Sequence, residues 1–343
     1  MARGRRVTRV DIGPWGETID EFAEACVAAE QAGFHTAWAT ELHRTPFVPL
    51  AAAASRTSRI GLGSGIALAF VRSPLTTALT ALDMSDLSDG RFALGLGTGV
   101  ARLNERWHNV PFDKPVARAR ETIAIIRRLM AEAHDGAPIA FEGEHQKIHL
   151  SNYERPFPPQ HPPAPIFLGS VGPAMSALAG EVADGWIGHE LGSPRYLAEW
   201  VLPAIRRGLD RAGRRREDIT LIASSACVIH EDSHTALRQM AGLVAFYASV
   251  RTYTDFFAFH GFERETQVIQ ARFRDGDIDG MIEACTDEMV AALSIAGTPD
   301  EARKKVDEYG AIVDAIKVTP PTHHTDPEVT RRAQRSILEH FAR

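Results

Sequence analysis

Short apolar runs alternate with amphipathic stretches along the whole chain. Eight of the apolar runs have the length of strands, at residues 7–13, 36–40, 59–68, 91–99, 165–170, 185–189, 219–229 and 314–320. Between them, apolar positions recur at helical spacing, as in residues 17–33, where Gly33 supplies a helix stop. Eight strands, each followed by helical sequence and with no long linker, predict one (β/α)8 TIM-barrel domain over residues 1–343. A doubly wound open sheet is the alternative, although such sheets usually have fewer strands.

Two insertions interrupt this alternation. Residues 139–150 alternate apolar and polar positions about a centre that contains Gly143, which predicts a β-hairpin. Residues 249–290 fit no single helix, and we expect this helical and loop segment to fold over one end of the barrel. Further helices are expected near residues 49–58, 73–90, 115–133, 173–183, 195–212, 234–248, 299–310 and 327–342.

Composition limits the classes of partner. Acidic residues (44) slightly outnumber basic ones (38), and the basic residues are scattered, so we expect no nucleic-acid partner. Cys26, Cys227 and Cys285 lie far apart in the sequence and form no disulfide framework or metal motif, which favours a reducing, cytoplasmic location. No apolar run has the length of a membrane span or of a signal peptide, so we expect no membrane partner.

Two glycine-rich runs occur at the ends of the third and fourth predicted strands. G-L-G-S-G spans residues 61–65 and G-L-G-T-G spans residues 95–99, an offset of one strand–helix unit. Neither fits the dinucleotide fingerprint G-x-G-x-x-G, because Ile66 and Val100 occupy the position of its third glycine. At the C-terminal rim of a barrel, these glycines would let the backbone approach a ligand closely or adopt a positive φ angle. The alternative is that they only relieve crowding where the barrel curves.

Further polar and aromatic residues follow predicted strands at the same rim. Glu41 and His43 form a candidate acid–base pair, with a solvated ion pair as the alternative. Residues 169–173, just before a predicted helix, form a candidate anion site through free backbone N–H groups, and N-capping by Ser170 is the alternative. Candidate residues for a substrate pocket, for which core packing or an interface is the alternative, are Trp15, Phe47, Phe70 and His189.

Histidines at the rim also raise the alternative of a metal-dependent hydrolase. They are His189, His323 and His324. Barrels of that class usually carry a His-x-His pair on the first strand, where this chain reads Val-Asp-Ile-Gly at residues 10–13, so we expect no catalytic metal. The sequence also lacks a G-x-S-x-G nucleophile elbow, which leaves covalent acyl chemistry unsupported.

Four sequence blocks, taken in order, carry a family resemblance. They are residues 33–99, 141–145, 162–189 and 296–318, and their most specific element is S-D-G-R-F-A-L-G-L-G at residues 88–97. The chain resembles the bacterial-luciferase-like superfamily of flavin and deazaflavin oxidoreductases, and it is most similar to the branch that depends on coenzyme F420. The likeness covers nearly the whole chain.

The resemblance implies a (β/α)8 barrel with the isoalloxazine-like ring of the cofactor across its C-terminal rim. It also implies a bulge with a non-proline cis peptide after the third strand, a ring contact at the end of the fourth strand, a polar contact shortly after it, and a cofactor phosphate site. In that order, the matching residues are Ser64, Gly65, Ile66 and Ala67; Gly97 and Thr98; Asn104; and Gly169, Ser170, Val171, Gly172 and Pro173.

Many deazaflavin-dependent members of this superfamily keep an acidic residue directly followed by His after the second strand. Here Leu42 separates Glu41 from His43, so we favour Glu41 as the acid–base residue by position and keep His43 as the second candidate. The resemblance implies hydride transfer between coenzyme F420 and a small organic substrate. An FMN-dependent monooxygenase and a non-catalytic flavin- or deazaflavin-binding protein are the alternatives. Homodimers are the habit of the family, and residues 249–290 are expected to shape the substrate pocket.

Overall fold

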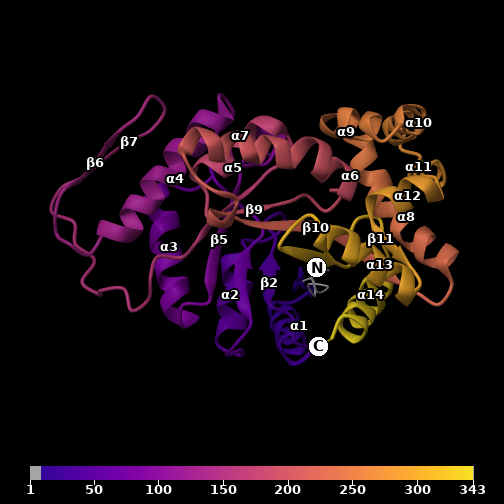
Figure 1. Cartoon of the computed structure of the whole chain (residues 1–343), viewed down its shortest axis with the longest axis horizontal. Coiled ribbons are helices and arrows are strands. Elements are labelled where there is room, and N and C mark those ends of the chain that lie inside the picture. The colour runs from indigo at the N-terminus through magenta and orange to yellow at the C-terminus, as the bar shows by residue number, and fades with distance from the viewer. Residues whose placement is uncertain (1–8, 343) are drawn as a thin grey trace, which may run out of the picture.

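The computed structural model, which describes residues 9–342, contains a closed barrel of eight parallel strands (Figure 1). In spatial order the strands are β1 (Arg9–Ile12), β2 (Thr36–Ala39), β3 (Gly61–Ser64), β5 (Phe92–Gly97), β8 (Ile166–Gly169), β9 (Gly185–Ile187), β10 (Thr220–Ile229) and β12 (Ala315–Thr319). Strand β12 pairs with β1 and completes the ring. The predicted barrel and its eight strands are confirmed, while residues 7 and 8 of the first predicted run lie outside the described part of the chain.

Helices cover the outside of the barrel (Figure 1). They are α1 (Ile19–Gln31), α2 (Phe47–Ala54), α3 (Pro74–Leu87), α4 (Pro115–Glu132), α5 (Pro173–Val182), α6 (Pro194–Tyr196), η2 (Leu197–Val201), α7 (Leu202–Ala212), η3 (Arg216–Asp218), α8 (Ser233–Ser249), α13 (Pro299–Gly310) and α14 (Pro327–His340). Local sequence sets several starts: Thr18 and Glu21 form a capping box at α1, and Ser73 caps α3. Within residues 9–342, no helix is long and apolar enough to cross a membrane.

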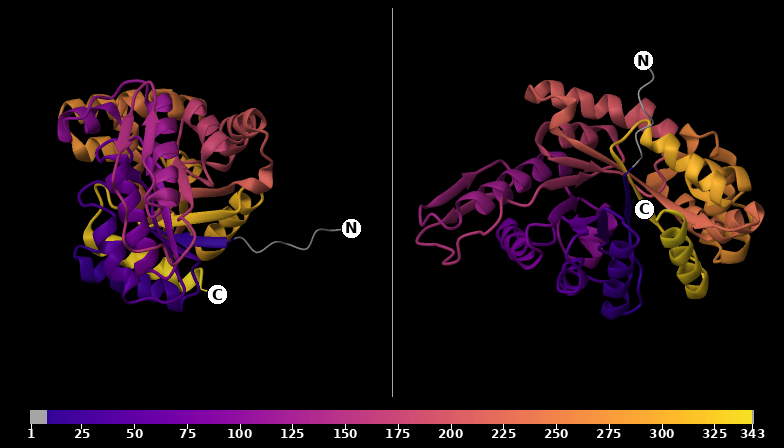
Figure 2. Two further views of the ribbon diagram at one scale, coloured as in Figure 1. Left: turned by 90° about the vertical axis from the view of Figure 1, so that its left-hand side faces the viewer. Right: turned by 60° about the horizontal axis from the view of Figure 1, so that its bottom comes forward.

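The two predicted insertions lie at opposite ends of the molecule (Figure 2). The hairpin is confirmed as β6 (Ile139–Glu142) paired antiparallel with β7 (Lys147–Leu150). Residues 249–290 contain η4 (Arg251–Tyr253), α9 (Thr254–Phe259), α10 (Glu263–Arg274), α11 (Ile278–Glu283) and the start of α12 (Asp287–Leu293). Of these, α10, α11 and α12 pack against α8, and α9 packs against α10. Strand β11 (Ile295–Gly297), which pairs with the end of β10, is absent from the sequence prediction because three residues carry too little pattern.

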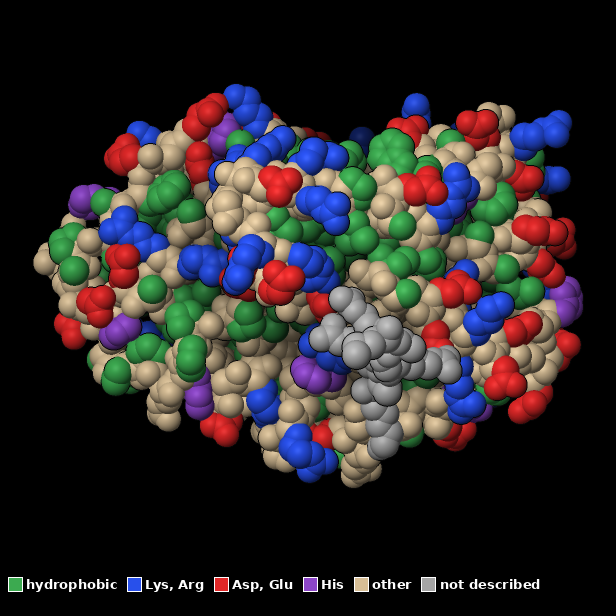
Figure 3. Space-filling model, viewed as in Figure 1, with side chains coloured by type: hydrophobic (Ala, Val, Ile, Leu, Met, Phe, Trp, Pro, Cys, Tyr) green, Lys and Arg blue, Asp and Glu red, His purple; other side chains and the backbone are tan. Residues whose placement is uncertain are grey.

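Both signs of charge are interspersed on the face of the molecule seen in Figure 3. Basic and acidic side chains lie beside one another there (Figure 3). The ion pair between Arg216 and Asp314, with 2.8 Å between Nη2 and Oδ2, is one such contact in the described chain. This face therefore presents a mixed surface of the kind that the scattered charges of the sequence predict.

The indole ring of Trp38 fills the middle of the barrel interior. The residue is 1% exposed, and its ring packs edge-on against Phe167 with 5.3 Å between the ring centroids. Its Nε1–H donates a hydrogen bond of 2.9 Å to Asp11, which is fully buried on β1. A buried indole N–H needs such an acceptor, so the interior is built around this pair.

The glycine-rich runs lie where the barrel interior is most crowded. A Cβ atom added at Gly63 would lie 2.4 Å from the Trp38 ring. One added at Gly95 would lie 1.9 Å from the carbonyl oxygen of Ser64 on the neighbouring strand. Relief of crowding therefore accounts for glycine at these two positions, since no side chain has room there.

Replacing Gly95 by Ala should destabilise the fold strongly. The new methyl group would press on backbone atoms, which cannot rotate away, so we expect a loss of about 3 kcal/mol in the free energy of unfolding, measured in urea. Gly172→Ala is the matched control, because a Cβ at Gly172 meets nothing within 4 Å, and its change should stay below about 1 kcal/mol. Equal losses in both variants would contradict the crowding argument.

Candidate active site

The C-terminal end of β3 carries a bulge that brings two neighbouring strand ends together. The peptide bond between Gly65 and Ile66 is cis, as the family resemblance implies, and strand β4 (Ala67–Leu68) then pairs with the end of β5. The Ile66 side chain occupies the space that side chains at Gly97 and Gly169 would need, since a Cβ atom there would lie 2.8 and 2.7 Å from it. The bulge thus packs against the ends of β5 and β8.

Glu41 fastens this bulge from the loop after β2. Its backbone N–H donates to the carbonyl oxygen of Ile66 at 3.2 Å. Its carboxylate accepts a 2.6 Å hydrogen bond from the N–H of Leu68 and forms a bidentate ion pair with Arg72. The Glu41 side chain is 7% exposed, so both oxygens are occupied by protein donors in a mostly buried position. The sequence did not indicate this arrangement, because Arg72 is thirty-one residues away.

His43 lies two residues further along the same loop, and its side chain is not held by protein contacts as that of Glu41 is. It is exposed, and no hydrogen bond joins its ring to another of residues 9–342. The neighbouring Arg44 donates from Nη2 to the carbonyl oxygen of Glu17 at 2.8 Å, which ties this loop to the loop after β1. His43 therefore presents an unengaged imidazole from a fastened loop.

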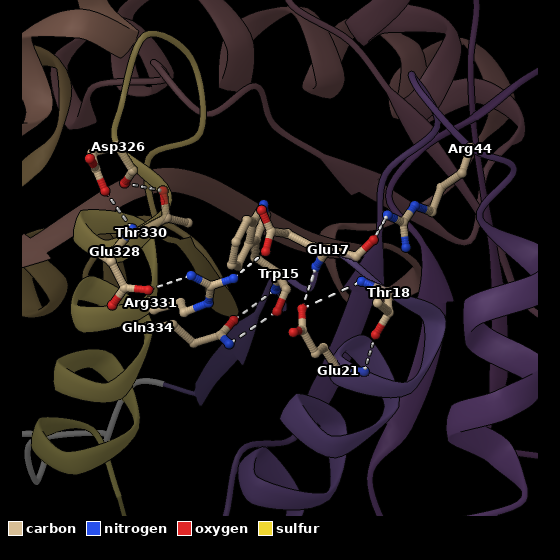
Figure 4. A network of polar contacts seen from close by, with 10 residues as sticks. All are labelled: Trp15, Glu17, Thr18, Glu21, Arg44, Asp326, Glu328, Thr330, Arg331 and Gln334. Carbon is tan, nitrogen blue, oxygen red and sulfur yellow. Dashed lines mark hydrogen bonds and ion pairs between the residues drawn. The ribbon is translucent and has the colours of Figure 1, made fainter.

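A polar network supports the same side of the rim (Figure 4). The backbone of Trp15 exchanges two hydrogen bonds with the Gln334 side chain on α14, at 2.7 and 3.1 Å. Arg331, also on α14, lies over the Trp15 ring and forms ion pairs with Glu17 and Glu328. These contacts hold Trp15, in the loop after β1, against α14, and its role as a pocket wall stays a prediction.

Residues 169–173 bring uncapped backbone to the rim. Helix α5 begins at Pro173, and its N-cap is Gly172, so no side chain caps the helix. Trp186 Nε1 donates to Ser170 Oγ at 2.8 Å, and Ser176 Oγ donates to the Gly172 carbonyl oxygen at 3.0 Å. Because the Ser176 hydroxyl already donates its proton to the Gly172 carbonyl oxygen, it accepts the 2.8 Å hydrogen bond from Ser170 Oγ. The alternative that Ser170 caps the helix is wrong.

This helix start can hold an anion. Its first backbone N–H groups have no side-chain acceptor, and the helix dipole adds partial positive charge. Val171 and Gly172 are partly or fully exposed, so a phosphate can reach them. The predicted phosphate site thus has the chemistry that a cofactor phosphate requires.

Asn104 holds the loop that follows β5. It lies on η1 (Leu103–Trp107) and is fully buried. Its Nδ2 donates to the carbonyl oxygens of Thr98 and Val100 at 2.8 and 3.1 Å. Its Oδ1 is buried and has no hydrogen-bond partner among residues 9–342. An unpaired buried acceptor calls for a donor, and a ligand beside this loop would supply one.

His189 lies beside a narrow pocket next to the α5 start. The pocket is lined by Ser170, Val171, Trp186, His189, Leu191, Gly192, Tyr196, Leu197, Val201, Tyr253 and Phe256. The N–H of Leu191 donates to His189 Nδ1 at 3.3 Å, so the neutral ring carries its proton on Nε2, which is 3.0 Å from the Tyr253 hydroxyl oxygen. Tyr253 belongs to residues 249–290, so the start of that segment does cover the rim.

Two further predicted pocket residues lie in the hydrophobic core. Phe47, on α2, packs against Phe92 with 6.4 Å between ring centroids. Phe70 packs against Phe112 at 6.2 Å, with the Arg118 guanidinium over its ring. Both are less than a tenth exposed, and their contact with a substrate stays a prediction.

Sequence reasoning missed a second polar group at the rim. Glu190 directly follows His189, and one carboxylate oxygen lies 3.9 Å from the ammonium of Lys317 on β12. Tyr253 and Tyr247 surround His189 at 5.0 and 4.7 Å between ring centroids. A lysine between apolar residues of a buried strand is the signal that could have found this group.

Comparison with known proteins shows to which family the chain belongs. The model of the luciferase-like monooxygenase family matches residues 4–314. The chain therefore belongs to this family, and the resemblance drawn from the sequence is confirmed.

Two mycobacterial relatives and one solved structure show what the chain resembles, and one of the two relatives has a name from the deazaflavin branch. An uncharacterised protein of Mycobacterium tuberculosis is 35% identical, over 87% of this chain and 88% of that protein. A second protein of the same organism, named provisionally as a coenzyme F420-dependent oxidoreductase, is 32% identical over 90% of this chain and 92% of its own length. The solved coenzyme F420-dependent tetrahydromethanopterin reductase of Methanopyrus kandleri shares the fold, with a TM-score of 0.81, 24% identity, and coverage of 98% of this chain and 99% of that one.

Acid should destabilise the protein partly through His189. Burial lowers the pKa of His189 from 6.5 to about 4, so between these pH values the unfolded chain binds a proton that the folded chain does not. The stability contributed by the neutral ring is complete above pH 6.5 and is lost as the pH falls toward 4, by roughly 3 kcal/mol. His189→Gln should flatten this part of the pH dependence in urea unfolding between pH 7 and 4.5.

The control for this measurement is His149→Gln, an exposed histidine on the β7 strand of the hairpin. It should keep the pH dependence of the wild type. An unchanged slope in the His189 variant would show that this imidazole is as easily protonated in the folded chain as in the unfolded one.

Proposed function

We propose that this protein is a coenzyme F420-dependent oxidoreductase that transfers hydride between the deazaflavin and a small organic substrate. The observation that carries the proposal is the uncapped start of α5 at the barrel rim, whose N–H groups suit a cofactor phosphate. The 32% identical mycobacterial relative supports the choice of coenzyme F420. When bound, the deazaflavin supplies a carbon that takes up or gives back a hydride.

The residues proposed to hold the cofactor form one continuous arc of the rim. The segment Gly169–Pro173 leads into α5, whose free first N–H groups bind the phosphate, and the bulge at Ser64–Ala67 lies beside Gly97 and backs the ring. Asn104 contributes its unpaired Oδ1 beside Thr98. This arrangement leaves the opposite arc, formed by β10, β12 and β1, open to the substrate.

We propose that His43 manages the proton and that Glu41 positions the bulge. A general acid–base residue must be free to exchange its proton with the substrate, and the Glu41 oxygens already accept from Arg72 and Leu68. His43 is exposed and has no such engagement within residues 9–342. Glu41 itself remains the alternative, since a substrate that displaces Arg72 would release it.

Two other functions are kept as alternatives. The luciferase-like family name favours an FMN-dependent monooxygenase, in which reduced flavin reacts with oxygen. A binding protein without catalysis would use the same phosphate site. As for partners and location, we propose a homodimer and a cytoplasmic protein, and gel filtration with light scattering tests the dimer.

Gly172→Asp should weaken the affinity for a phosphorylated cofactor without loss of stability. Asp is a favoured N-cap, and a side chain fits here because a Cβ atom meets nothing within 4 Å. Its carboxylate would take the N–H groups that the phosphate needs and would also repel it, so we expect at least a tenfold weaker affinity. Fluorescence titration with coenzyme F420 and, separately, with FMN measures this and identifies the cofactor.

Gly172→Asn is the matched control, because it caps the helix with nearly the same shape and no charge. Its affinity should lie between those of the wild type and the Asp variant. Wild-type affinity in the Asp variant would move the phosphate elsewhere. Tight binding of FMN together with failure to bind coenzyme F420 would favour the monooxygenase.

His43→Gln and Glu41→Gln should fail in different ways. Loss of a general acid–base residue typically costs about 100-fold or more in rate, so His43→Gln should lower turnover by that factor at unchanged cofactor affinity. Glu41→Gln loses the charge that Arg72 pairs with, so it should lower the melting temperature and weaken cofactor binding. Oxidation of reduced coenzyme F420 by a panel of small aldehydes, ketones and enones measures turnover. Lost turnover with intact binding and stability in Glu41→Gln alone would reverse the two roles.

A further inference from the structure

Lys317 is a buried lysine in the wall of the barrel. The chain has five lysines, and Lys317, at 3% exposed, is the buried one. It lies on β12, two residues after Ala315, which faces the barrel interior beside Trp38. Because side chains of a strand alternate, Lys317 faces the same interior one level nearer the C-terminal rim. Burying an ammonium costs free energy unless the charge is paired, so the groups that surround Lys317 indicate its role.

The neighbouring strands place two polar side chains in the same row. Lys317 is in register with Asp11 on β1 and with Ser224 on β10. Asp11 is already neutralised, since it accepts from Arg9 through two contacts of 3.2 Å and from the Trp38 indole. No ion pair within 4 Å joins Asp11 to Lys317 in the described chain, so Asp11 acts on the ammonium only at longer range.

Glu190 is the carboxylate nearest to Lys317, yet the two do not form a hydrogen bond. Their closest atoms, Nζ and Oε1, are 3.9 Å apart, which exceeds hydrogen-bond distance. The Glu190 side chain is 21% exposed at the rim, and no hydrogen bond joins its carboxylate to another of residues 9–342. The pair therefore has an ammonium with free donors on one side and a carboxylate with free acceptors on the other.

Two hydroxyl groups beside this pair also lack partners. Ser224 Oγ and Thr319 Oγ1 are both buried, and neither makes a hydrogen bond within the described chain. Thr319 faces the same way as Lys317, because a Cβ atom at Gly13 would contact both side chains. Buried polar groups are rarely left unpaired in native proteins. Four polar groups with free hydrogen-bonding capacity thus lie at one place on the rim.

We propose that Lys317 and Glu190, with Ser224 and Thr319, form a binding site for an uncharged oxygen of the ligand, the hydroxyl or carbonyl group of a small organic molecule. The inference rests on the proposed function in calling that molecule the substrate. The ammonium and the carboxylate cancel in charge, so the site disfavours an anion near Glu190 and a cation near Lys317. A hydroxyl group satisfies both, since its oxygen accepts from Lys317 Nζ while its O–H donates to Glu190. A carbonyl oxygen accepts from Lys317 and from either hydroxyl.

The pair binds the oxygen of the ligand through hydrogen bonds and leaves the proton-transfer role to His43. Burial lowers the pKa of Lys317, while the Glu190 and Asp11 carboxylates work in the opposite direction. A hydroxyl held between them has an acceptor for its proton in Glu190 and a donor for its oxygen in Lys317. The site lies on the arc of β10 and β12, across the barrel from the bulge at β3.

Three small probes of equal shape and different charge test this site on the cofactor-free protein. They are 3,3,3-trifluoropropanol, 3,3,3-trifluoropropanoate and 3,3,3-trifluoropropylammonium, and their binding at pH 7 is measured by fluorine NMR line broadening. In the wild type, the alcohol should bind at least fivefold more tightly than either ion. Lys317→Met should weaken alcohol binding at least fivefold and favour the ammonium probe. Glu190→Gln should favour the carboxylate probe.

The matched control is the exposed pair Lys147 and Glu142 on the hairpin, with 3.1 Å between its charged atoms. Lys147→Met and Glu142→Gln should leave binding of all three probes unchanged. Thermal unfolding verifies the fold of each variant, and Lys317→Gln replaces the Met variant if that chain does not fold.

Tightest binding of the carboxylate probe to the wild type would overturn the proposal in favour of an anion site. Equal binding of all probes to the wild type and to both site variants would reduce the pair to a structural role. Since no cofactor is present, these results are independent of whether the protein binds coenzyme F420. Failure of the cofactor titration would remove the proposed function and leave this binding site standing.

Discussion

The indole of Trp38 occupies the centre of the barrel, and the neighbouring strands are arranged to admit it. Gly63 lies against the ring on β3, and Phe167 meets it edge-on from β8. Its N–H donates to Asp11, which holds a charge deep in the interior. One large side chain therefore dictates small residues on one side of the barrel and a polar group on the other. The chemistry of the rim follows from this division.

On the side of β3 and β5, the backbone itself forms the rim. Because Gly97 has no side chain, the bulge at Ile66 can pack against the end of β5, and Glu41 holds the bulge through Ile66 and Leu68. On the side of β12, Asp11 is neutralised from below by Arg9, which leaves Lys317 with no close partner in its own row. The Glu41 carboxylate is thus paired with Arg72, whereas the Lys317 ammonium lies 3.9 Å from the nearest carboxylate oxygen.

Much of the fold could be predicted from the sequence because its strands and helices depend on local patterns of apolar and polar residues. The eight strands, the hairpin at 139–150 and the flanking helices follow from periodicity and turn residues. Residues 249–290 could not be resolved into α9–α12, since short helices carry little periodic signal. The site was predictable only as positions on strand ends. The bond of Glu41 to Arg72 and the approach of Glu190 to Lys317 join distant segments, and only the closed barrel brings them together.

The two carboxylates of the rim illustrate why position alone does not assign a role. Glu41 has the place in sequence that the family resemblance favours, yet its oxygens bind a guanidinium and an N–H. Glu190 has no such precedent in the sequence, yet its oxygens have no hydrogen-bonding partner within residues 9–342 and lie at the open edge of the rim. A group that exchanges protons with a ligand must have hydrogen-bonding capacity to spare, and a group that holds a backbone bulge must not. By this criterion Glu41 is part of the scaffold that holds the bulge, and the free oxygens of Glu190 are available to the proposed binding site.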